Sequence, residues 1–332
     1  MLAPIAWRTP PRHYGPWELF ASLLADGLVA AGHDVTLFAT ADSITTATLC
    51  STSPRGWNDD DEADRKVAEA MHVANAFEHA AELDVIHNGF DFLPLTYSSL
   101  VDTAVVTTIH GFSSPRILPI YERYDASTSY VAISDADRHP ALHYAATIHH
   151  GIDTDAFSID PHPGDHLLFF GRIHPDKGTA TAIEVAARAG RRLVIAGIVH
   201  DQRYFDEEVA PHVDGDRVRY IGPVAATDRS TVLGAAHALL HLIDFDEPFG
   251  YSVVEAMACG TPVVAYPRGS MPELITDTVT GFLVDGPDHA VLAVEAADAL
   301  DRAAIRDAAA ARFGLARMIG RYVDVYRSVL TA

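Results

Sequence analysis

The sequence predicts an α/β fold made of two doubly wound domains, each a parallel sheet covered by helices. Short runs rich in Val, Ile and Leu alternate with longer helical patterns along most of the chain. This pattern is typical of parallel strands that are buried on both faces. The 332 residues, of which 48% are hydrophobic, are enough for two hydrophobic cores of ordinary size. A disordered or disulfide-dense protein is therefore excluded.

The first half contains a clear first helix and several strand candidates. Pro16 suits the first turn of this helix and Gly32 ends it, and the opening segment MLAPIAW is expected to form a short strand before it. The acidic segment 58–65 is interpreted as the start of another helix rather than as a cation site, and His33 as a packing residue. The further strand candidates are residues 34–40, 84–88, 104–110 and 130–134.

A segment dense in Asp, Gly and Pro at residues 151–166 predicts a linker between the two halves. We therefore expect a first domain at residues 1–155 and a second at residues 156–314. A helix over about 315–332 is expected to pack back onto the first domain. Its apolar residues are Met318, Tyr322, Val325 and Leu330. The strand candidates of the second domain are residues 167–171, 192–197, 218–222, 238–243 and 262–266.

The net charge and the number of cysteines exclude several classes of partner and of metal site. The formal net charge is −21, so the field of the whole molecule repels nucleic acid and anionic lipid. Two cysteines are too few for a cysteine-rich metal site and fit a reducing compartment. No apolar run approaches the roughly 20 residues that cross a bilayer. We therefore expect a cytoplasmic protein with no nucleic-acid partner and no transmembrane segment.

The turn after the first strand of the second domain carries two cations beside a helix start. Arg172 and Lys177 lie in the segment LLFFGRIHPDKG, which ends at Gly178. Lys177 is one of only two lysines in the chain, which favours a functional role over that of an ordinary surface cation. A forked guanidinium, an ammonium and the positive end of a helix together suit a diphosphate. The segment therefore predicts a diphosphate site.

Two glutamates eight residues apart mark a second candidate site, in the segment DEPFGYSVVEAMACGTPVVA. Glu247 precedes a loop, and Glu255 lies in the helix that follows. The residues that open this helix are Phe249, Gly250, Tyr251 and Ser252. Backbone amides at a helix start can face sugar hydroxyls or phosphate. Because the neighbours of Glu255 are apolar, an unpaired carboxylate there would be costly, and a ribose diol would suit it.

These segments together resemble retaining glycosyltransferases of family four, also called glycosyl transferases group 1. That family has the GT-B fold, in which two Rossmann-like domains face a central cleft. The strongest element is EPFGYSVVEAMACGTPVVA, which is similar to the paired-glutamate motif of the family, and GRIHPDKG accompanies it. Further segments match in the same order, so the resemblance covers essentially the whole chain. They are YGPWE, GHDVTLFA, TIHG, VAIS, HHGID, RGSMPELI and TGFLV.

The resemblance implies a role for each candidate residue of the second domain. Arg172 and Lys177 would hold the diphosphate of the donor, and Glu255 the ribose hydroxyls. Glu247, with the backbone amides of residues 249–252, would contact the transferred sugar. The base of the nucleotide would be read by the backbone near Ile221 and Gly222. Among the branches of the family, those that use GDP-mannose or UDP-glucose are the most similar to this sequence.

The resemblance also assigns two residues of the first domain. His110, at the end of TIHG, would lie at the reaction centre and contact the donor sugar. Gly15 matches the first glycine of a loop whose amides approach the donor phosphate. Pro16 stands where the second glycine is expected, and it removes one donor amide, so the backbone contact would rest on Gly15 and Trp17.

Asp244 and Asp246 form a carboxylate pair that holds a divalent metal in a different transferase fold. Here a cationic grip on the diphosphate already replaces such a metal, and hard cations also require a suitable set of oxygen ligands. We therefore expect no metal site and no cofactor other than the nucleotide sugar as cosubstrate.

The predicted activity is that of a retaining, metal-independent hexosyltransferase. It would move a hexose from a nucleotide-diphosphate sugar to a hydroxyl of a sugar or small-molecule acceptor, with His110, Glu247, Arg172 and Lys177 as the catalytic set. Two alternatives stay open. A sugar phosphorylase of the same fold would have no ribose for Glu255 to hold, and a non-catalytic nucleotide-sugar-binding protein would bind the donor without turnover. A nicotinamide dehydrogenase is disfavoured, because no G-x-G-x-x-G follows a first strand.

Overall fold

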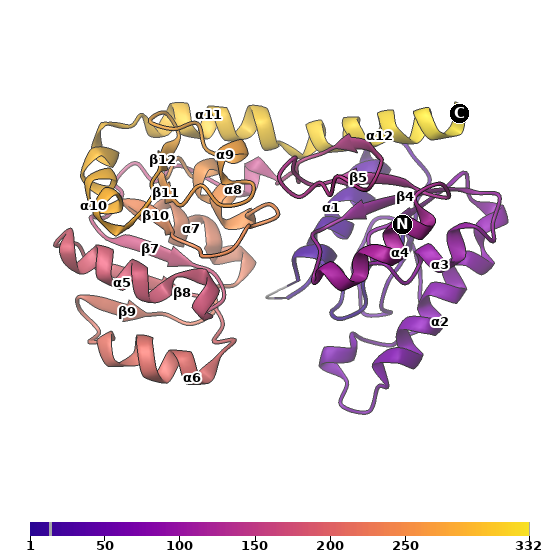
Figure 1. The fold of residues 1–332 in the computed structure, drawn as a ribbon, viewed down its shortest axis with the longest axis horizontal. Coiled ribbons are helices and arrows are strands. Elements are labelled where there is room, and N and C mark those ends of the chain that lie inside the picture. The colour runs from indigo at the N-terminus through magenta and orange to yellow at the C-terminus, as the bar shows by residue number, and fades with distance from the viewer. Residues whose placement is uncertain (13–14, 332) are drawn as a thin grey trace. The chain divides into compact units, whose positions relative to one another are not determined.

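The computed structural model describes residues 1–12 and 15–331, which form two compact units. The first unit contains residues 1–151 and the C-terminal segment from Leu315 onward, and the second is Ile152–Gly314. In each unit a parallel sheet is covered by helices (Figure 1), which confirms the predicted α/β class. Tyr14 of the YGPWE segment lies outside the described residues.

The sheet of the first unit is built from parallel pairings. Strands β3, β4, β5 and β6 form one part, and β1 with β2 the other. Leu2 pairs with both Phe38 and Asn88 and so joins the two parts, which reduces the expected opening strand to a single bridging residue. The strands are β1 (Thr36–Phe38), β2 (Thr48–Cys50), β3 (Val85–Asn88), β4 (Ala104–Ile109), β5 (Ser129–Ala132) and β6 (Tyr144–Thr147).

Two helices of the first unit begin where the sequence predicts. Helix α1 starts at Pro16, and the chain turns away after it at Gly32, whose φ is 90°. The acidic segment ends in Asp64, which caps α2 by accepting a hydrogen bond from the Val67 amide at 3.0 Å; this confirms the helix start. The helices of this unit other than α12 are α1 (Pro16–Ala30), α2 (Arg65–Glu78), α3 (Leu95–Ser98) and α4 (Leu118–Tyr124).

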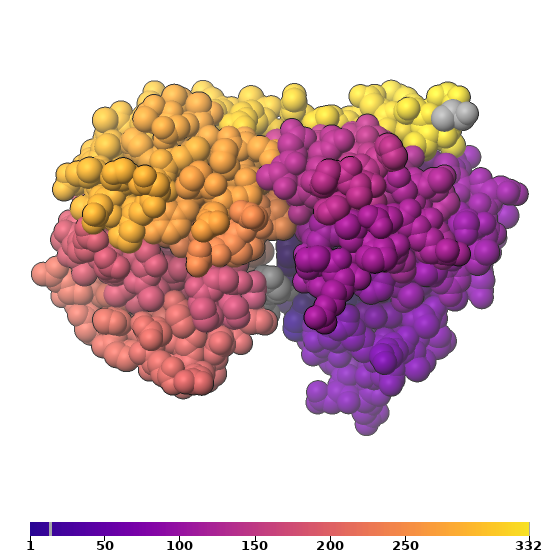
Figure 2. All heavy atoms as spheres, in the orientation of Figure 1, coloured from indigo at the N-terminus to yellow at the C-terminus, as the bar shows by residue number. Residues whose placement is uncertain are grey.

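The C-terminal helix α12 (Leu315–Thr331) belongs to the first unit and packs beside α1. Figure 2 shows its yellow atoms lying against the purple atoms of that unit. Met318, Tyr322 and Val325 are buried in a core shared with α1. Leu330, which was expected to cover the same apolar surface as these three residues, is instead 54% exposed near the end of the helix. The prediction for His33 was also wrong, since it is exposed in the turn after α1.

The second unit has a six-stranded parallel sheet in the order β12-β11-β10-β7-β8-β9. Numbered within the unit, this is the order 6-5-4-1-2-3 of a Rossmann-type sheet, and its direction of winding reverses between the neighbours β7 and β10. Ligands of such sheets bind beyond the carboxyl ends of the strands at this reversal. The strands are β7 (Leu167–Phe170), β8 (Leu193–Ala196), β9 (Val218–Tyr220), β10 (Ala238–His241), β11 (Val263–Ala265) and β12 (Gly281–Leu283).

Helices pack on the second sheet, and alternate residues of its strands, such as Leu167 and Ile195, are buried in one core with apolar residues of the segments 182–186 and 290–297. They are α5 (Thr179–Arg188), α6 (Gln202–Tyr204), α7 (Arg229–Gly234), α8 (Tyr251–Ala258), α9 (Met271–Leu274), α10 (Pro287–Ala296) and α11 (Arg302–Phe313). Within residues 1–12 and 15–331, none of the helices combines the length and the apolarity needed to span a bilayer.

Candidate functional site

The turn after β7 is held close to the end of β10 by a glycine and a hydrogen bond. Gly178 has a φ of 72°, and a Cβ atom placed on it would lie 1.9 Å from the carbonyl oxygen of Leu242. Only glycine fits such a position without strain. The Asp244 amide donates to the carbonyl oxygen of Asp176 at 2.9 Å. The two loops at the reversal point of the sheet are therefore fixed to each other.

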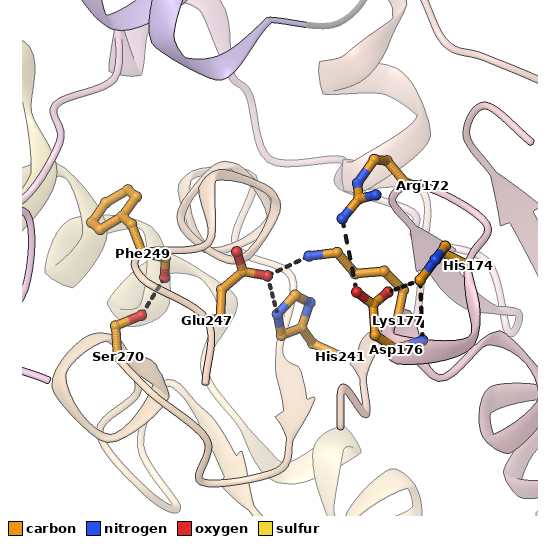
Figure 3. Close-up of polar contacts among 8 residues, drawn as sticks. All are labelled: Arg172, His174, Asp176, Lys177, His241, Glu247, Phe249 and Ser270. Atoms are coloured by element: carbon orange, nitrogen blue, oxygen red, sulfur yellow. Dashed lines mark hydrogen bonds and ion pairs between the residues drawn. The ribbon is translucent and has the colours of Figure 1, made fainter. Parts of the chain in front are cut away.

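Both predicted cations lie on this turn and are largely buried. The guanidinium of Arg172 lies 4.0 Å from the carboxylate of Asp176. Lys177 donates to Oε2 of Glu247 at 2.5 Å, and its ammonium lies 4.4 Å from the centre of the Phe245 ring. In Figure 3 the ammonium of Lys177 points at the carboxylate of Glu247. The structure thus brings together the two segments that the sequence marks separately.

The loop that carries Glu247 is shaped by two glycines and a serine. Gly269, with a φ of 55°, packs so closely on Glu247 that an added Cβ would lie 2.3 Å from the Glu247 carbonyl oxygen. The hydroxyl of Ser270 donates to the carbonyl oxygen of Phe249 at 2.5 Å. Gly250, with a φ of 103°, precedes the first turn of α8. Because first-turn amides have no partner within their own helix, α8 begins with donors beside Glu247.

His241, the last residue of β10, lies under the same carboxylate. Its Nε2 is 3.8 Å from Oε2 of Glu247 and is buried without a hydrogen-bond partner among the described residues. Burial lowers the pKa of His241 to about 4, so its imidazole is neutral at physiological pH. The carboxylate of Glu247 therefore lies between an ammonium and a neutral imidazole (Figure 3).

Glu255 is 3% exposed and forms an ion pair that the sequence analysis missed. Its Oε1 accepts from Arg229 at 2.7 Å, and the guanidinium of Arg229 lies 5.8 Å from the centre of the Phe170 ring. Oε2 of Glu255 is buried and has no hydrogen-bond partner among the described residues. Burial raises the pKa of Glu255, and the charge of Arg229 opposes this rise. One carboxylate oxygen is thus anchored, and the other is left for a donor group.

Glycines follow the neighbouring strands β7, β8 and β9. An added Cβ on Gly197, whose φ is 149°, would lie 1.7 Å from the carbonyl oxygen of Gly171. The Gly197 amide donates to the carbonyl oxygen of Gly222 at 2.9 Å. Gly222 has a φ of 76° and open space where a side chain would be. The main chains that follow β7, β8 and β9 therefore lie close together at this edge of the sheet.

His110 follows β4 in the first unit and lies among aromatic rings. It stacks between Trp17 and His150, with ring centres 5.4 and 5.3 Å away, and Phe20 meets it edge-on at 4.7 Å. Burial lowers the pKa of His110 to about 3. Neither ring nitrogen has a hydrogen-bond partner among the described residues. Buried polar atoms are normally paired, so these nitrogens are candidates for contact with a ligand.

Gly15 caps α1 with a φ of 151°, next to a second residue that the sequence analysis missed. An added Cβ on Gly15 would lie 2.7 Å from Oε2 of Glu18. Glu18 is buried, and its Oε1 accepts from the Trp7 amide at 3.2 Å. Burial raises the pKa of Glu18 to about 7. Gly15 therefore lies close to a carboxyl group whose pKa is near neutral.

The predicted site residues divide between the two units. Gly15 and His110 lie in the first unit. The second unit holds Arg172, Lys177, Gly222, Glu247, Phe249, Gly250, Tyr251, Ser252 and Glu255. Asp244 and Asp246 are engaged locally: Asp244 accepts from Arg268 at 3.2 Å, and Asp246 from the Gly269 amide at 3.2 Å.

Comparisons with known proteins agree with this geometry. Residues 155–312 match the family model described as glycosyl transferases group 1. D-Inositol 3-phosphate glycosyltransferases of Mycobacterium bovis and Mycobacterium tuberculosis are 32% identical over 160 residues, which cover 42% of this chain. The match spans 32% of the length of these curated relatives.

Solved structures match nearly the whole chain. AviGT4, a glycosyltransferase involved in avilamycin A biosynthesis, is 26% identical with a TM-score of 0.72, covering 98% of this chain and 93% of that one. Sucrose-phosphate synthase from Thermosynechococcus elongatus is 19% identical with a TM-score of 0.76, covering 96% and 94%. HepE from Anabaena, in complex with UDP and glucose, is 21% identical with a TM-score of 0.73, covering 95% and 96%. Residues 155–312 of this chain are therefore similar to the glycosyl transferases group 1 domain, and its two Rossmann-like units have the GT-B fold.

Proposed function

We propose that this chain is a retaining glycosyltransferase that moves a hexose from GDP-mannose or UDP-glucose to a hydroxyl of a sugar or small-molecule acceptor. The observation that carries the proposal is the pairing of two loops at the reversal point of the second sheet. One loop supplies Arg172 and Lys177, and the other supplies Glu247. A Rossmann-type sheet binds its nucleotide at this place.

Stabilisation of the leaving group is the main catalytic task of such an enzyme. Negative charge develops on the diphosphate as its bond to the sugar breaks, and preorganised cations lower the energy of that state. Arg172 and Lys177 supply two positive charges on one rigid turn. In the proposed reaction the acceptor attacks from the side of the leaving group, and a phosphate oxygen takes its proton. His110 contacts the donor sugar through a ring nitrogen.

Glu255 favours a nucleotide donor over inorganic phosphate. Its Oε2 is buried and unpartnered among the described residues, while Oε1 is held by Arg229. A ribose hydroxyl would satisfy that oxygen, whereas leaving it unpaired is costly. A sugar phosphorylase has no ribose to place there, so the second of the two glutamates supports the transferase.

We also propose that catalysis needs no metal ion. Among the described residues no group of three or more His, Cys, Asp and Glu side chains is arranged to hold one. Turnover should be unchanged in EDTA. Activity that EDTA abolishes and Mg²⁺ or Mn²⁺ restores would overturn this part of the proposal.

The two lysines of the chain provide a matched test. Lys177→Ala removes a cation from the site, and Lys66→Ala removes an exposed one from α2 in the first unit. Turnover of UDP-glucose and GDP-mannose, including hydrolysis to water, is measured for both variants, with thermal melting as a check on folding. UDP-glucose is the first donor to test, because HepE, which shares this fold, has been solved in complex with UDP-glucose.

The proposal predicts that Lys177→Ala loses about 100-fold or more in turnover and keeps a cooperative melting transition, while Lys66→Ala keeps the wild-type rate. A Lys177→Ala variant with the wild-type rate would contradict the assignment. A wild-type protein that binds donor tightly but never hydrolyses or transfers it would instead favour the non-catalytic binding protein.

A further inference from the structure

The ion pair between Lys177 and Glu247 joins two residues to which the proposed function assigns different parts of the donor. The two side chains are 14% and 16% exposed, and the atoms that join them lie 2.5 Å apart. In the proposed function Lys177 holds the diphosphate and Glu247 holds the sugar. In the structure each of these charges is neutralised by the other.

The surroundings hold this pair in place. The Phe245 ring lies against the ammonium at 4.4 Å, and the Asp244 amide ties the Glu247 loop to the lysine turn at 2.9 Å. Nε2 of His241 lies 3.8 Å from the same carboxylate oxygen that accepts from Lys177. The ion pair is therefore a built feature of the site rather than a chance contact between flexible side chains.

A diphosphate that reaches Lys177 also approaches the Glu247 carboxylate. Like charges at such short range in a partly buried site repel strongly. The other ion pair of the site differs in this respect. Glu255 bonds Arg229 through Oε1 and keeps a buried, unpartnered Oε2 among the described residues, so it can accept a hydroxyl without giving up its cation. At Lys177 a second anion would instead lie beside the Glu247 carboxylate, and exchange of one anion for the other removes this repulsion.

We propose that Glu247 is an internal counter-ion of Lys177 that is exchanged for the diphosphate of the donor. Donor binding turns Lys177 to the phosphate oxygens and frees Oε2 of Glu247 to accept from hydroxyls of the transferred sugar. When transfer has removed that sugar, the carboxylate returns to Lys177 and weakens its hold on the nucleoside diphosphate. Glu247 thus has a second role, that of promoting product release. This inference rests on the proposed function.

The exchange predicts an unusual effect of one substitution. Glu247→Gln removes the competing charge and keeps the size of the side chain, so free UDP or GDP should bind about tenfold or more tightly than to the wild type. Turnover of the nucleotide sugar should fall, because the hydroxyls of the sugar lose a charged hydrogen-bond acceptor and the product leaves slowly. Calorimetric titration with UDP, GDP and inorganic pyrophosphate measures the affinities, and pyrophosphate isolates the effect on the diphosphate.

Two further variants separate exchange from a general effect of charge. Asp246→Asn removes the same charge from an exposed residue of the same loop that bonds the Gly269 amide, so its affinity for UDP should change little. In a Lys177→Ala background the cation that Glu247 competes for is absent, and Glu247→Gln should give a smaller gain. Thermal melting of each variant checks that the fold is intact.

The outcomes are distinct. The exchange is supported if Glu247→Gln binds UDP more tightly than the wild type and Asp246→Asn does not. The gain in affinity should also be smaller in the Lys177→Ala background. Unchanged or weaker binding by Glu247→Gln, equal tightening by Asp246→Asn, or an equal gain in the Lys177→Ala background would overturn it. A wild-type protein that binds none of the three ligands would overturn the proposed function together with the exchange.

Discussion

The buried carboxyl group of Glu18 makes the stability of the first unit depend on pH. Glu18 is 3% exposed, and burial raises its pKa from the ordinary 4.5 to about 7. Between these values the folded chain holds a proton that the unfolded chain has lost. The stabilisation is thus complete below pH 4.5 and is lost as the pH rises to about 7. Each pKa unit is worth about 1.4 kcal/mol, so the loss amounts to about 3 kcal/mol.

The substitution Glu18→Gln removes the ionisable group and keeps an oxygen that can accept from the Trp7 amide. The free energy of unfolding of the variant minus that of the wild type should therefore rise by about 3 kcal/mol between pH 4.5 and 7, and level off above. Tryptophan fluorescence during urea unfolding is a specific probe, because the three tryptophans, at positions 7, 17 and 57, all lie in the first unit.

Glu82→Gln, at an exposed position of the same unit, is the control. Its difference from the wild type should not change with pH. A Glu18→Gln curve that runs parallel to the wild-type curve from pH 4.5 to 8.5 would refute the reasoning, because it would mean that Glu18 is ionised in the folded protein throughout this range.

Three further predictions concern the site residues. Arg229→Met leaves the Glu255 carboxylate buried without its cation and should cost about 3–5 kcal/mol of unfolding free energy, measured by urea denaturation; a cost below 1 kcal/mol would contradict the pairing. Gly178→Ala forces a Cβ against the Leu242 carbonyl oxygen and should lower the melting temperature and weaken UDP binding together; an unchanged variant would show that the turn has another conformation. Since burial lowers the pKa of His110 to about 3, its ring proton signals should not titrate between pH 5 and 8 in NMR spectra, and a midpoint near pH 6.5 would contradict its burial.

The strands that lie in an apolar run could be predicted from the sequence, and they include the edge strand β9. Each apolar run chosen as a strand candidate from residue 34 onward contains a strand, because most of these strands are buried on both faces. The opening segment MLAPIAW, which was also expected to form a strand, gives only the bridging residue Leu2. The strands that were missed, β2, β6 and β12, lie at the ends of their sheets. Their residues are partly exposed, as in Thr48–Cys50 and Tyr144–Thr147, so no continuous apolar run marks them.

The sequence predicted individual residues of the site, but it did not predict every residue with which they pair. The turn at Arg172 and Lys177 and the two glutamates each have a local signature, and the structure brings Lys177 and Glu247 together. Arg229 has no such signature: it starts α7 among polar residues and reaches Glu255 only after folding. The apolar helix around Glu255 implies a partner for its carboxylate, but that this partner is a cation depends on the packing of α7 against α8.

Glu18 was missed for a related reason. An acidic residue in the first turn of a helix is ordinarily an exposed group favoured by the helix dipole. Here Gly15 lies against the carboxyl group of Glu18, and burial raises the pKa of this group. The sequence pattern is the same for an exposed and for a buried first-turn glutamate, so only the tertiary structure distinguishes the two.

A crystal structure of the protein with UDP-glucose or GDP-mannose would test the central claim most directly. We expect the diphosphate within hydrogen-bonding distance of the Arg172 guanidinium and the Lys177 ammonium, and a ribose hydroxyl on Oε2 of Glu255. A nucleotide bound elsewhere, or bound with both cations directed into solvent, would contradict the account.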